Sequence, residues 1–206
     1  MRSPSSRWLV LLLGAVLADC GGGSPAVPTP SLPALERLAI AQQVVSTALG
    51  GFTPGTFAAR SIDVPLSSLL CEQTCSGSTC TVTCPVDERF QCPGGGTATD
   101  RGTVVGTLDE SLTGQATLDA RQTYSNCRTD SGITLNGDPH TTATGTARFV
   151  NGELAGEQSA HVSGAVRHES PESSGRCAVD LQVTFTLGQG AAARGTACGE
   201  PVNVAF

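Results

Sequence analysis

The sequence contains no lysine, and all twelve of its cationic residues are arginine. Its formal net charge at pH 7 is −6, and the arginines are spread along the chain rather than gathered into a basic stretch. Binding to DNA or RNA depends on clustered cations that neutralise phosphates. The charge pattern therefore gives no support for a nucleic-acid partner, and we expect none.

Aromatic residues are also scarce, at 4% of the chain, and the only tryptophan is Trp8. A domain with few large side chains buries little apolar surface per residue, so cross-links add more to its stability. Nine cysteines are present. The composition thus predicts a thin hydrophobic core supported by disulfide bonds.

A third absence is an apolar run of the roughly 20 residues that a membrane-spanning helix needs. Instead, Arg2 and Arg7 precede a ten-residue apolar stretch from Trp8 to Leu17. A charged start followed by a short apolar stretch is typical of an export signal. We predict that residues 1–19 are a signal peptide.

The signal ends in Leu17-Ala18-Asp19-Cys20, followed at once by three glycines. This segment resembles a lipobox, the bacterial motif in which a cysteine receives a diacylglyceryl group and becomes the mature N-terminus. The resemblance implies a bacterial lipoprotein, lipidated at Cys20 and attached to a membrane through that anchor. Because Gly21 rather than aspartate follows, it also implies the outer membrane. The residue before the cysteine is usually Gly, Ala or Ser, so ordinary cleavage after Ala18 remains the alternative.

The cysteine count supports lipidation independently. An unpaired thiol is a liability in an oxidising compartment, and nine is an odd number. If Cys20 is acylated, the other eight cysteines form an even set.

Residues 20–33 are predicted to be the lipidated cysteine and a flexible linker, because Gly21 to Pro33 is rich in Gly, Pro and Ser. A helix is predicted from Pro33 to Leu49, stopped by Gly50-Gly51. One face of this helix is apolar, and Glu36, Gln43 and Thr47 lie opposite it. The apolar face contains Leu38, Ala41, Val45, Ala48 and Leu49. We expect it to dock onto the sheet of the same chain, with partner binding as the alternative.

Four cysteines predict a cross-linked hairpin. The pair Cys71 and Cys84 and the pair Cys75 and Cys80 share one centre, at Gly77-Ser78. In a hairpin turning there, each pair is directly opposed. Because four residues separate the cysteines of each arm, both pairs lie on one face. A zinc site is the alternative, although its usual ligand pairs are closer in sequence and an exported protein favours disulfides.

From Gly94 onward, apolar and polar residues alternate in a Thr/Val/Gly-rich chain, which is typical of half-buried strands. The clearest cases are residues 112–120 and 177–187. Asn151-Gly152 predicts a two-residue turn that pairs Phe149 with Leu154, Ala147 with Gly156, and Ala143 with Ala160. Asn136-Gly137 predicts a bulge or loop, because Pro139 cannot donate to a ladder.

Glycines inside the predicted strands indicate curvature. They are Gly106, Gly114, Gly145, Gly156 and Gly164. We therefore expect residues 34–206 to form a mainly β domain, with one N-terminal helix and disulfides. Its antiparallel meander would form a curved sheet or a closed or half-closed barrel. The C-terminal residues 201–206 resemble the assembly signal of outer-membrane barrels. The missing aromatic girdles and the polar outward positions favour a last strand of a soluble sheet instead.

Three segments, 92–97, 123–127 and 132–137, resemble a pattern in uncharacterised β-rich bacterial envelope lipoproteins. In this sequence they are Cys92-Pro93-Gly94-Gly95-Gly96-Thr97, Thr123-Tyr124-Ser125-Asn126-Cys127 and Gly132-Ile133-Thr134-Leu135-Asn136-Gly137. The resemblance implies no activity. It does imply that Cys92 bonds Cys127, which leaves Cys177 and Cys198 as the fourth pair.

Residues that could perform catalysis are few. His140, His161 and His168 lack the spacing of helical zinc ligands, and we interpret them as surface histidines. Asp87-Glu88 and Asp109-Glu110 are interpreted as turn residues, because adjacent side chains on a strand point apart. Residues 94–96 lack the lysine and the helix of a phosphate loop.

These observations predict a non-enzymatic envelope lipoprotein without metal or cofactor, whose β domain has a structural, binding or assembly role. The sequence does not specify its protein or small-molecule partner. One alternative is a small-molecule carrier, which requires a large apolar cavity inside the sheet. The other is a hydrolase, which requires a cluster of histidine, carboxylate and serine in a cleft.

Overall fold

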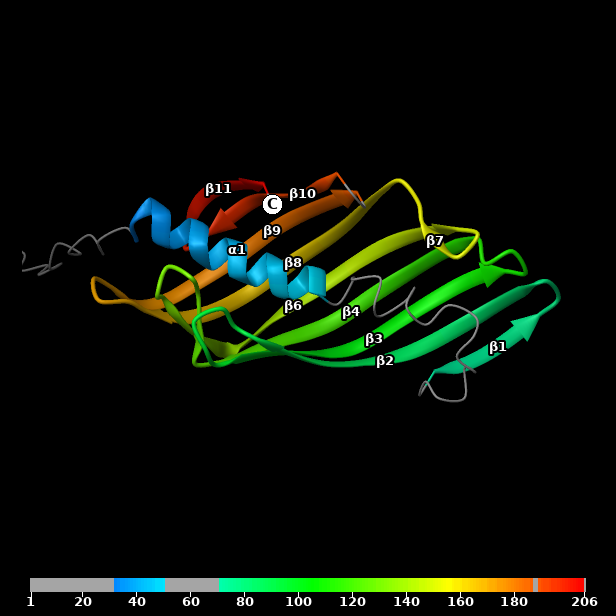
Figure 1. Ribbon diagram of the computed structural model, residues 1–206, viewed down its shortest axis with the longest axis horizontal. Coiled ribbons are helices and arrows are strands. Elements are labelled where there is room, and N and C mark those ends of the chain that lie inside the picture. The colour runs from blue at the N-terminus through cyan, green and yellow to red at the C-terminus, as the bar shows by residue number, and fades with distance from the viewer. Residues whose placement is uncertain (1–31, 51–70, 187–188, 206) are drawn as a thin grey trace, which may run out of the picture. The chain divides into compact units, whose positions relative to one another are not determined.

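The computed structural model describes residues 32–50, 71–186 and 189–205. These residues form one helix and eleven strands (Figure 1). The helix is α1 (Ala34–Gly50). The strands are β1 (Glu72–Ser76), β2 (Thr79–Gln91), β3 (Thr97–Asp109), β4 (Gly114–Ser125), β5 (Cys127–Arg128), β6 (Thr134–Val150), β7 (Glu153–Leu154), β8 (Glu157–Glu169), β9 (Ser174–Thr186), β10 (Gly190–Ala197) and β11 (Glu200–Ala205).

All the strands belong to one antiparallel sheet, in the order β1-β2-β3-β4-β6-β8-β9-β10-β11. The short strands β5 and β7 each pair with β6. Neighbours in the sheet follow one another along the chain, so short turns connect them, as antiparallel pairing allows. Within the described residues the sheet is open, with β1 and β11 at its edges. The predicted mainly β antiparallel meander with one N-terminal helix is therefore confirmed, in the form of an open curved sheet.

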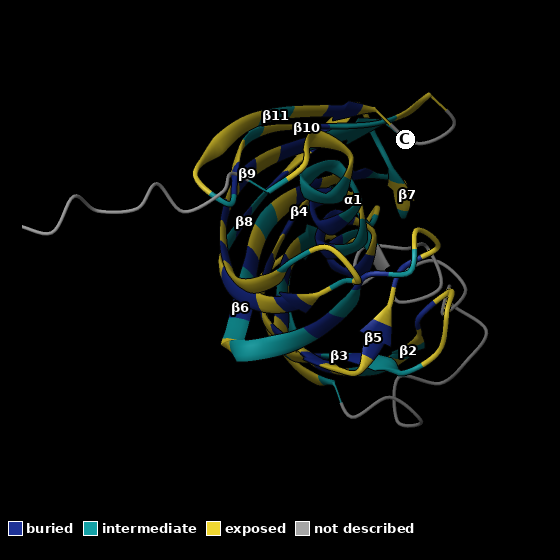
Figure 2. Cartoon of the chain, turned by 90° about the vertical axis from the view of Figure 1, so that its left-hand side faces the viewer, coloured by how far each residue is buried: buried dark blue, intermediate teal, exposed yellow. Residues whose placement is uncertain are grey.

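Helix α1 lies inside the curve of the sheet (Figure 2). It contacts β3 towards one edge, β8 in the middle, and β10 and β11 at the other edge. Ile40, Val44 and Val45 of α1 have no exposed surface, and they share one core cluster with Val162 and Leu181 of the sheet. Each such burial is worth about 1.5–3 kcal/mol. The core thus fills the space between the helix and the concave face, and the predicted docking of the helix onto its own sheet is confirmed.

The helix begins and ends within one residue of the prediction, but its buried face is wider than predicted. Ile40 and Val44 are buried, and so is Thr47, which the prediction placed on the polar side. The exposed positions include Leu35, Gln42 and Ser46. A curved sheet contacts the helix from several directions, so the buried face exceeds the stripe that a flat sheet would cover.

The predicted alternation is confirmed in β4 and β9, where every second side chain is buried. At the predicted turn, Asn151 and Gly152 have φ of 53° and 79°, and Phe149 pairs with Leu154. The predicted pairing of Ala143 with Ala160 is wrong, because Ala143 pairs with Val162. The predicted pairing of Ala147 with Gly156 is also wrong, because Gly156 precedes β8 and belongs to no ladder. The strands are displaced by two residues, which keeps the same side chains on the concave face.

Gln158 explains the displacement. The residue is 2% exposed, and its side chain supplies hydrogen-bond partners for the backbone where the ladder is broken between β7 and β8. The backbone N–H of Arg148 donates to Oε1 of Gln158 over 2.7 Å. Nε2 of Gln158 donates to the carbonyl oxygens of Ala155 and Gly156 over 2.9 and 3.0 Å. Backbone groups that a regular ladder would pair are satisfied by this side chain instead.

Close approaches between strands occur at glycine. The β6–β8 ladder is irregular between Gly137 and Thr141, as the predicted bulge or loop implies. Opposite the irregularity, Gly164 has a φ of 131°, and an added Cβ would lie 2.7 Å from the carbonyl oxygen of His140. At Gly102 of β3, a Cβ would lie 2.0 Å from the carbonyl oxygen of Asp119 in β4. Only residues without a side chain allow the backbones to approach this closely.

The predicted signal peptide (1–19), Cys20 and nearly all of the linker (20–33) lie outside the described residues. In the part of the chain that the structure describes, no helix is long and apolar enough to span a membrane.

Candidate functional site

All eight described cysteines form disulfides. The pairs are those predicted: Cys71–Cys84, Cys75–Cys80, Cys92–Cys127 and Cys177–Cys198. The first two cross-link the β1–β2 hairpin, where Cys75 directly faces Cys80. The fourth ties β9 to the β10–β11 turn. Cys20, the ninth cysteine of the sequence, lies outside the described residues.

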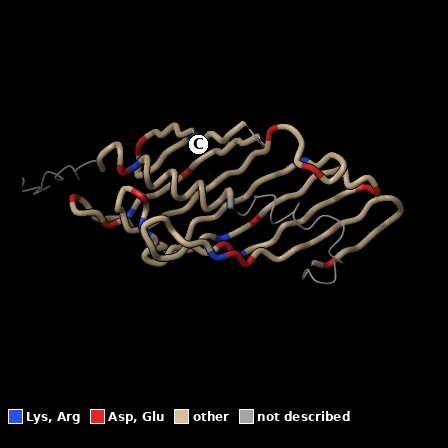
Figure 3. The backbone as a smooth tube through the Cα atoms, in the orientation of Figure 1, with Lys and Arg blue, Asp and Glu red and all other residues tan. Residues whose placement is uncertain are grey.

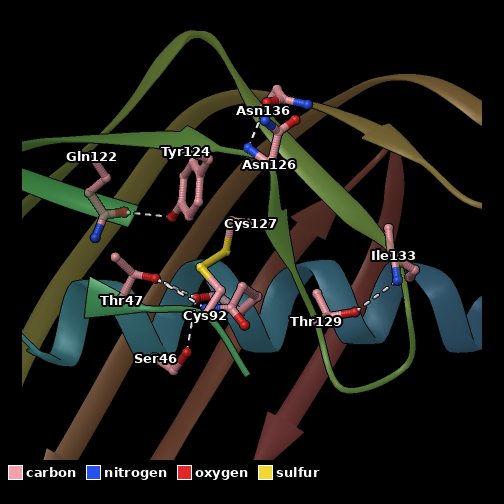
Figure 4. The surroundings of a disulfide bond; sticks show 11 residues. Ser46, Thr47, Cys92, Gln122, Tyr124, Asn126, Cys127, Thr129, Ile133 and Asn136 are labelled. Carbon is pink, nitrogen blue, oxygen red and sulfur yellow. Dashed lines mark hydrogen bonds between the residues drawn. A yellow bond between two sulfur atoms is a disulfide. The ribbon is translucent and has the colours of Figure 1, made fainter. Parts of the chain in front are cut away.

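The Cys92–Cys127 disulfide brings together the three segments 92–97, 123–127 and 132–137 (Figure 4). The N–H of Gly94 donates to the carbonyl of Arg128, and the N–H of Arg128 donates to the carbonyl of Gly95, both over 2.8 Å. The N–H of Asn126 donates to Oδ1 of Asn136 over 2.9 Å. The three segments therefore form a cross-linked cluster of loops at one end of the sheet.

Gly96 shows why this cluster requires glycine. Its φ is 76°, and an added Cβ would lie 1.8 Å from the carbonyl oxygen of Asn126. Gly95 also has a positive φ, of 103°, but nothing lies within 4 Å of the position that its Cβ would take. Gly96 is thus needed for the close approach between the two loops, whereas Gly95 is needed only for the turn.

This cluster and the start of the β8–β9 turn line a broad concavity of about 600 Å³, which we call the loop-end concavity. Its lining comprises residues 94–96, 126, 128, 132, 134 and 169–171. The volume lies in the range of ligand sites in proteins, about 300–1,000 Å³. The charged residues of this lining are Arg128 and Glu169, so the loop-end concavity carries one charge of each sign.

The ladders place these two residues in one row. Arg128 of β5 pairs with Thr134 of β6, and Thr134 pairs with Glu169 of β8. Each of the three residues has a buried neighbour in its own strand. These neighbours are Cys127, Leu135 and His168. Because side chains alternate along a strand, Arg128, Thr134 and Glu169 all point away from the core.

A second polar group lies inside the core, on the face of the sheet that α1 covers. Asp100 of β3 pairs with Gln122 of β4, which pairs with Thr141 of β6. Asp100 is 1% exposed, and Gln122 and Thr141 are fully buried. Thr141 donates to Oε1 of Gln122 over 3.0 Å, and the Tyr124 hydroxyl lies 3.4 Å from the same oxygen. Figure 4 shows Gln122 and Tyr124 above α1, on the side where Thr47 lies.

The Asp100 carboxyl has no hydrogen-bond partner among the described residues, and neither has Nε2 of Gln122. Burial raises the pKa of Asp100 to about 7, the nearby Gln122 side chain opposes the rise, and the Glu88 carboxylate of β2 adds to it. Burial also raises the pKa of Tyr124, against the effect of Thr141 and Thr47. The sequence contained a signal for this group, because Asp100 and Gln122 occupy apolar positions of their strands' alternation.

A third polar group joins the start of α1 to the β8–β9 turn. Glu36 accepts hydrogen bonds from the hydroxyls of Ser170 and Ser173, over 2.8 and 2.6 Å. His168 is 7% exposed, so its interpretation as a surface histidine is wrong. It occupies a position of β8 whose side chain faces the core. Burial lowers its pKa, and Glu36 acts in the opposite direction.

The hydrolase alternative requires a nucleophile that is hydrogen-bonded to a general base. Neither ring nitrogen of His168 has a hydrogen-bond partner among the described residues, so no proton path joins it to Ser170. His161 lies on the outer side of β8, where Nε2 is 2.6 Å from a carboxylate oxygen of Asp180. Both side chains of this pair are substantially exposed, at 40% and 70%. His140 is half-buried and lies beside the irregularity of β6.

The acidic pairs are placed differently from one another. Asp109 caps the β3–β4 turn, where it accepts from the hydroxyl of Ser111 and from the N–H groups of Ser111 and Thr113, and these bonds lower its pKa. Asp87 and Glu88 lie inside β2, so their interpretation as turn residues is wrong. Asp87 instead pairs with Arg101 of β3 over 3.1 Å. In the described ranges, no three histidine, cysteine or acidic residues are grouped to hold a metal ion.

The carrier alternative requires an apolar cavity inside the sheet. A small apolar depression with a volume of about 10 Å³ lies on β3, β4 and β6, lined in part by Val104, Leu118 and Ala147. These three residues are at most 5% exposed. On the same face, α1 packs against β3, β8, β10 and β11.

Comparison with other proteins adds no assignment: no family model, no curated protein and no solved structure matches this chain.

Proposed function

We propose that this chain is a lipid-anchored bacterial envelope protein whose β domain acts by binding, not by catalysis. The observation that carries the anchor is the pairing of the cysteines. Eight of the nine cysteines are used in disulfides, and Cys20 is the one that remains. That cysteine is also the one that ends the lipobox-like segment. Acylation would give it a stable chemical state in an oxidising compartment.

The architecture fits a protein held outside the cytoplasm. Disulfides persist in the periplasm and at cell surfaces, whereas cytosolic thiols are kept reduced. Residues 21–33 would separate the anchor from the domain by roughly 40 Å at full extension. A three-chain lipid anchor would hold the protein permanently, since one chain alone binds only marginally. Gly21, in place of an aspartate after the lipidated cysteine, favours sorting to the outer membrane.

Binding is favoured over catalysis by the composition of the loop-end concavity. Its walls are glycine backbone, hydroxyl and amide groups, one guanidinium and one carboxylate. The serine hydroxyl among them, that of Ser170, already donates to Glu36. Such walls complement a polar ligand without supplying an activated nucleophile.

Membrane fractionation tests the anchor. The full chain is expressed with its own N-terminus in a Gram-negative host, beside Cys20→Ala and Asp19→Ala. We expect the original chain and Asp19→Ala in the outer-membrane fraction, released only by detergent, because Ala before the cysteine fits the lipobox better. No processed form of Cys20→Ala should be found in the outer-membrane fraction. Equal amounts of Cys20→Ala and the original chain in the outer-membrane fraction, or a soluble processed original chain, would contradict the proposal.

A further inference from the structure

Arg128 is the arginine that lines the loop-end concavity. Its guanidinium forms no ion pair with the described residues, unlike Arg101, Arg167 and Arg176, which each lie within 4 Å of an aspartate carboxylate. No carboxylate of the described residues pairs with Arg128, although its side chain is exposed. Figure 3 shows how sparse charge is along the strands. A guanidinium that faces a concavity without a partner is a site for an oxyanion.

The Arg128 side chain is also held in place. An added Cβ at Gly94 would lie 2.9 Å from Cγ of Arg128, so the aliphatic stem lies directly against this glycine. An added Cβ at Gly132 would lie 3.7 Å from Nη2. The backbone of Arg128 is fixed by two hydrogen bonds to the 92–96 turn and by the adjacent Cys92–Cys127 disulfide. A side chain fixed before binding loses less conformational entropy when the ligand arrives.

Glu169 provides the complementary charge on the other wall. It lies two strands from Arg128, with Thr134 between them, and strands in a sheet are separated by about 4.8 Å, so the two backbones are roughly 10 Å apart. Both residues line the concavity, and no ion pair joins Arg128 to Glu169 in the described structure. An extended chain spans at most about 3.6 Å per residue, so two or three residues match this separation.

We infer that the loop-end concavity binds a short zwitterionic peptide, with the peptide's carboxylate on Arg128 and its ammonium group on Glu169. Thr134 lies between the two charges and offers a hydroxyl to the peptide backbone. The inference rests on the proposed binding function, and it adds the class of ligand and the two residues that recognise it.

The test uses the mature protein in mild detergent and follows its backbone amides by ¹H–¹⁵N NMR. The probes are triglycine, N-acetyl-triglycine, triglycine amide and inorganic phosphate. The variants are Arg128→Gln and Glu169→Gln, and Arg194→Gln removes an exposed arginine of β10 as a matched control. Because all three positions are exposed, the substitutions leave the core intact, and an unchanged melting temperature verifies this.

We expect triglycine to cause saturable shifts at Gly94, Gly95 and Gly132. Each blocked peptide should bind at least about tenfold more weakly, because one charge-assisted hydrogen bond is lost. Arg128→Gln and Glu169→Gln should weaken triglycine binding to a similar degree, and Arg194→Gln should leave it unchanged.

Several outcomes would overturn the inference. These are the absence of saturable shifts, equal binding of free and blocked peptides, tighter binding of phosphate, or unchanged binding by Arg128→Gln. Membrane fractionation tests the anchor separately. A protein that is anchored but fails this titration would refute the ligand class alone.

Discussion

Substituting Asp100 should change how the stability of the domain depends on pH. Asp100 is 1% exposed, its carboxyl oxygens lack hydrogen bonds to described residues, and its pKa is raised from 3.8 to about 7. Between these values the unfolded chain has lost its proton while the folded chain retains it. The free energy of unfolding therefore falls as pH rises from about 4 to 7 and is level above that.

The magnitude follows from the size of the rise. At about 1.4 kcal/mol per pKa unit, the Asp100 contribution lowers the free energy of unfolding by about 4 kcal/mol between pH 4 and pH 8. Asp100→Asn carries no charge at any pH, so this part of the dependence should disappear. At pH 8 the variant should be the more stable protein, by an amount reduced by the cost of burying the amide.

Guanidinium unfolding followed by circular dichroism, at intervals from pH 4 to pH 8, measures this. Asp119→Asn removes an exposed carboxyl from the outer side of β4 and is the matched control. The difference between the original chain and Asp100→Asn isolates the contribution of this one group from all others. If the two proteins show parallel pH profiles, Asp100 is not held in its protonated form in the folded domain, and the reasoning from its burial is wrong.

Three further predictions concern stability. Burial lowers the pKa of His168, so the neutral side chain should contribute to stability above pH 6.5, and this contribution should be lost as pH falls. In His168→Leu the melting temperature should depend less on pH in this range. An unchanged pH dependence would refute the prediction. Removing Cys92–Cys127, which closes 35 residues, should cost about 4 kcal/mol, against about 2 for Cys75–Cys80, which closes 5. Chemical denaturation of the two double Cys→Ser variants measures both, and an equal loss would show that loop length is not decisive. Gly96→Ala should destabilise the domain by at least about 2 kcal/mol more than Gly95→Ala, because only Gly96 abuts Asn126, and equal melting temperatures would contradict this.

Much of the fold follows from local sequence patterns. The alternation in 177–187 predicts β9 because a strand buried on one face repeats every two residues. Asn151-Gly152 predicts its turn because both residues accept positive φ. The common centre of Cys71–Cys84 and Cys75–Cys80 predicts the hairpin because opposed residues in an antiparallel pair have a constant sum of positions.

The errors arise where a polar side chain enters the core. The two-residue displacement between β6 and β8 depends on the side chain of Gln158 replacing backbone partners, and no local pattern distinguishes this glutamine from an exposed one. Thr47 and His168 are buried because the sheet curves around α1, which is a tertiary effect. The loop-end concavity could not be predicted for the same reason. Its charged residues, Arg128 and Glu169, are 41 positions apart in the sequence, and they lie on one surface because their strands both pair with β6.

The most direct test of the account is the intact mass of the mature protein extracted from membranes, with fragmentation of its N-terminal peptide. We predict a chain that begins at Cys20 and carries a diacylglyceryl group on the Cys20 thiol and an acyl group on its amine. Its mass should also be lower by eight hydrogen atoms, the number removed when four disulfides form. A mature chain that begins at Asp19, with Cys20 unmodified, would contradict the lipid anchor.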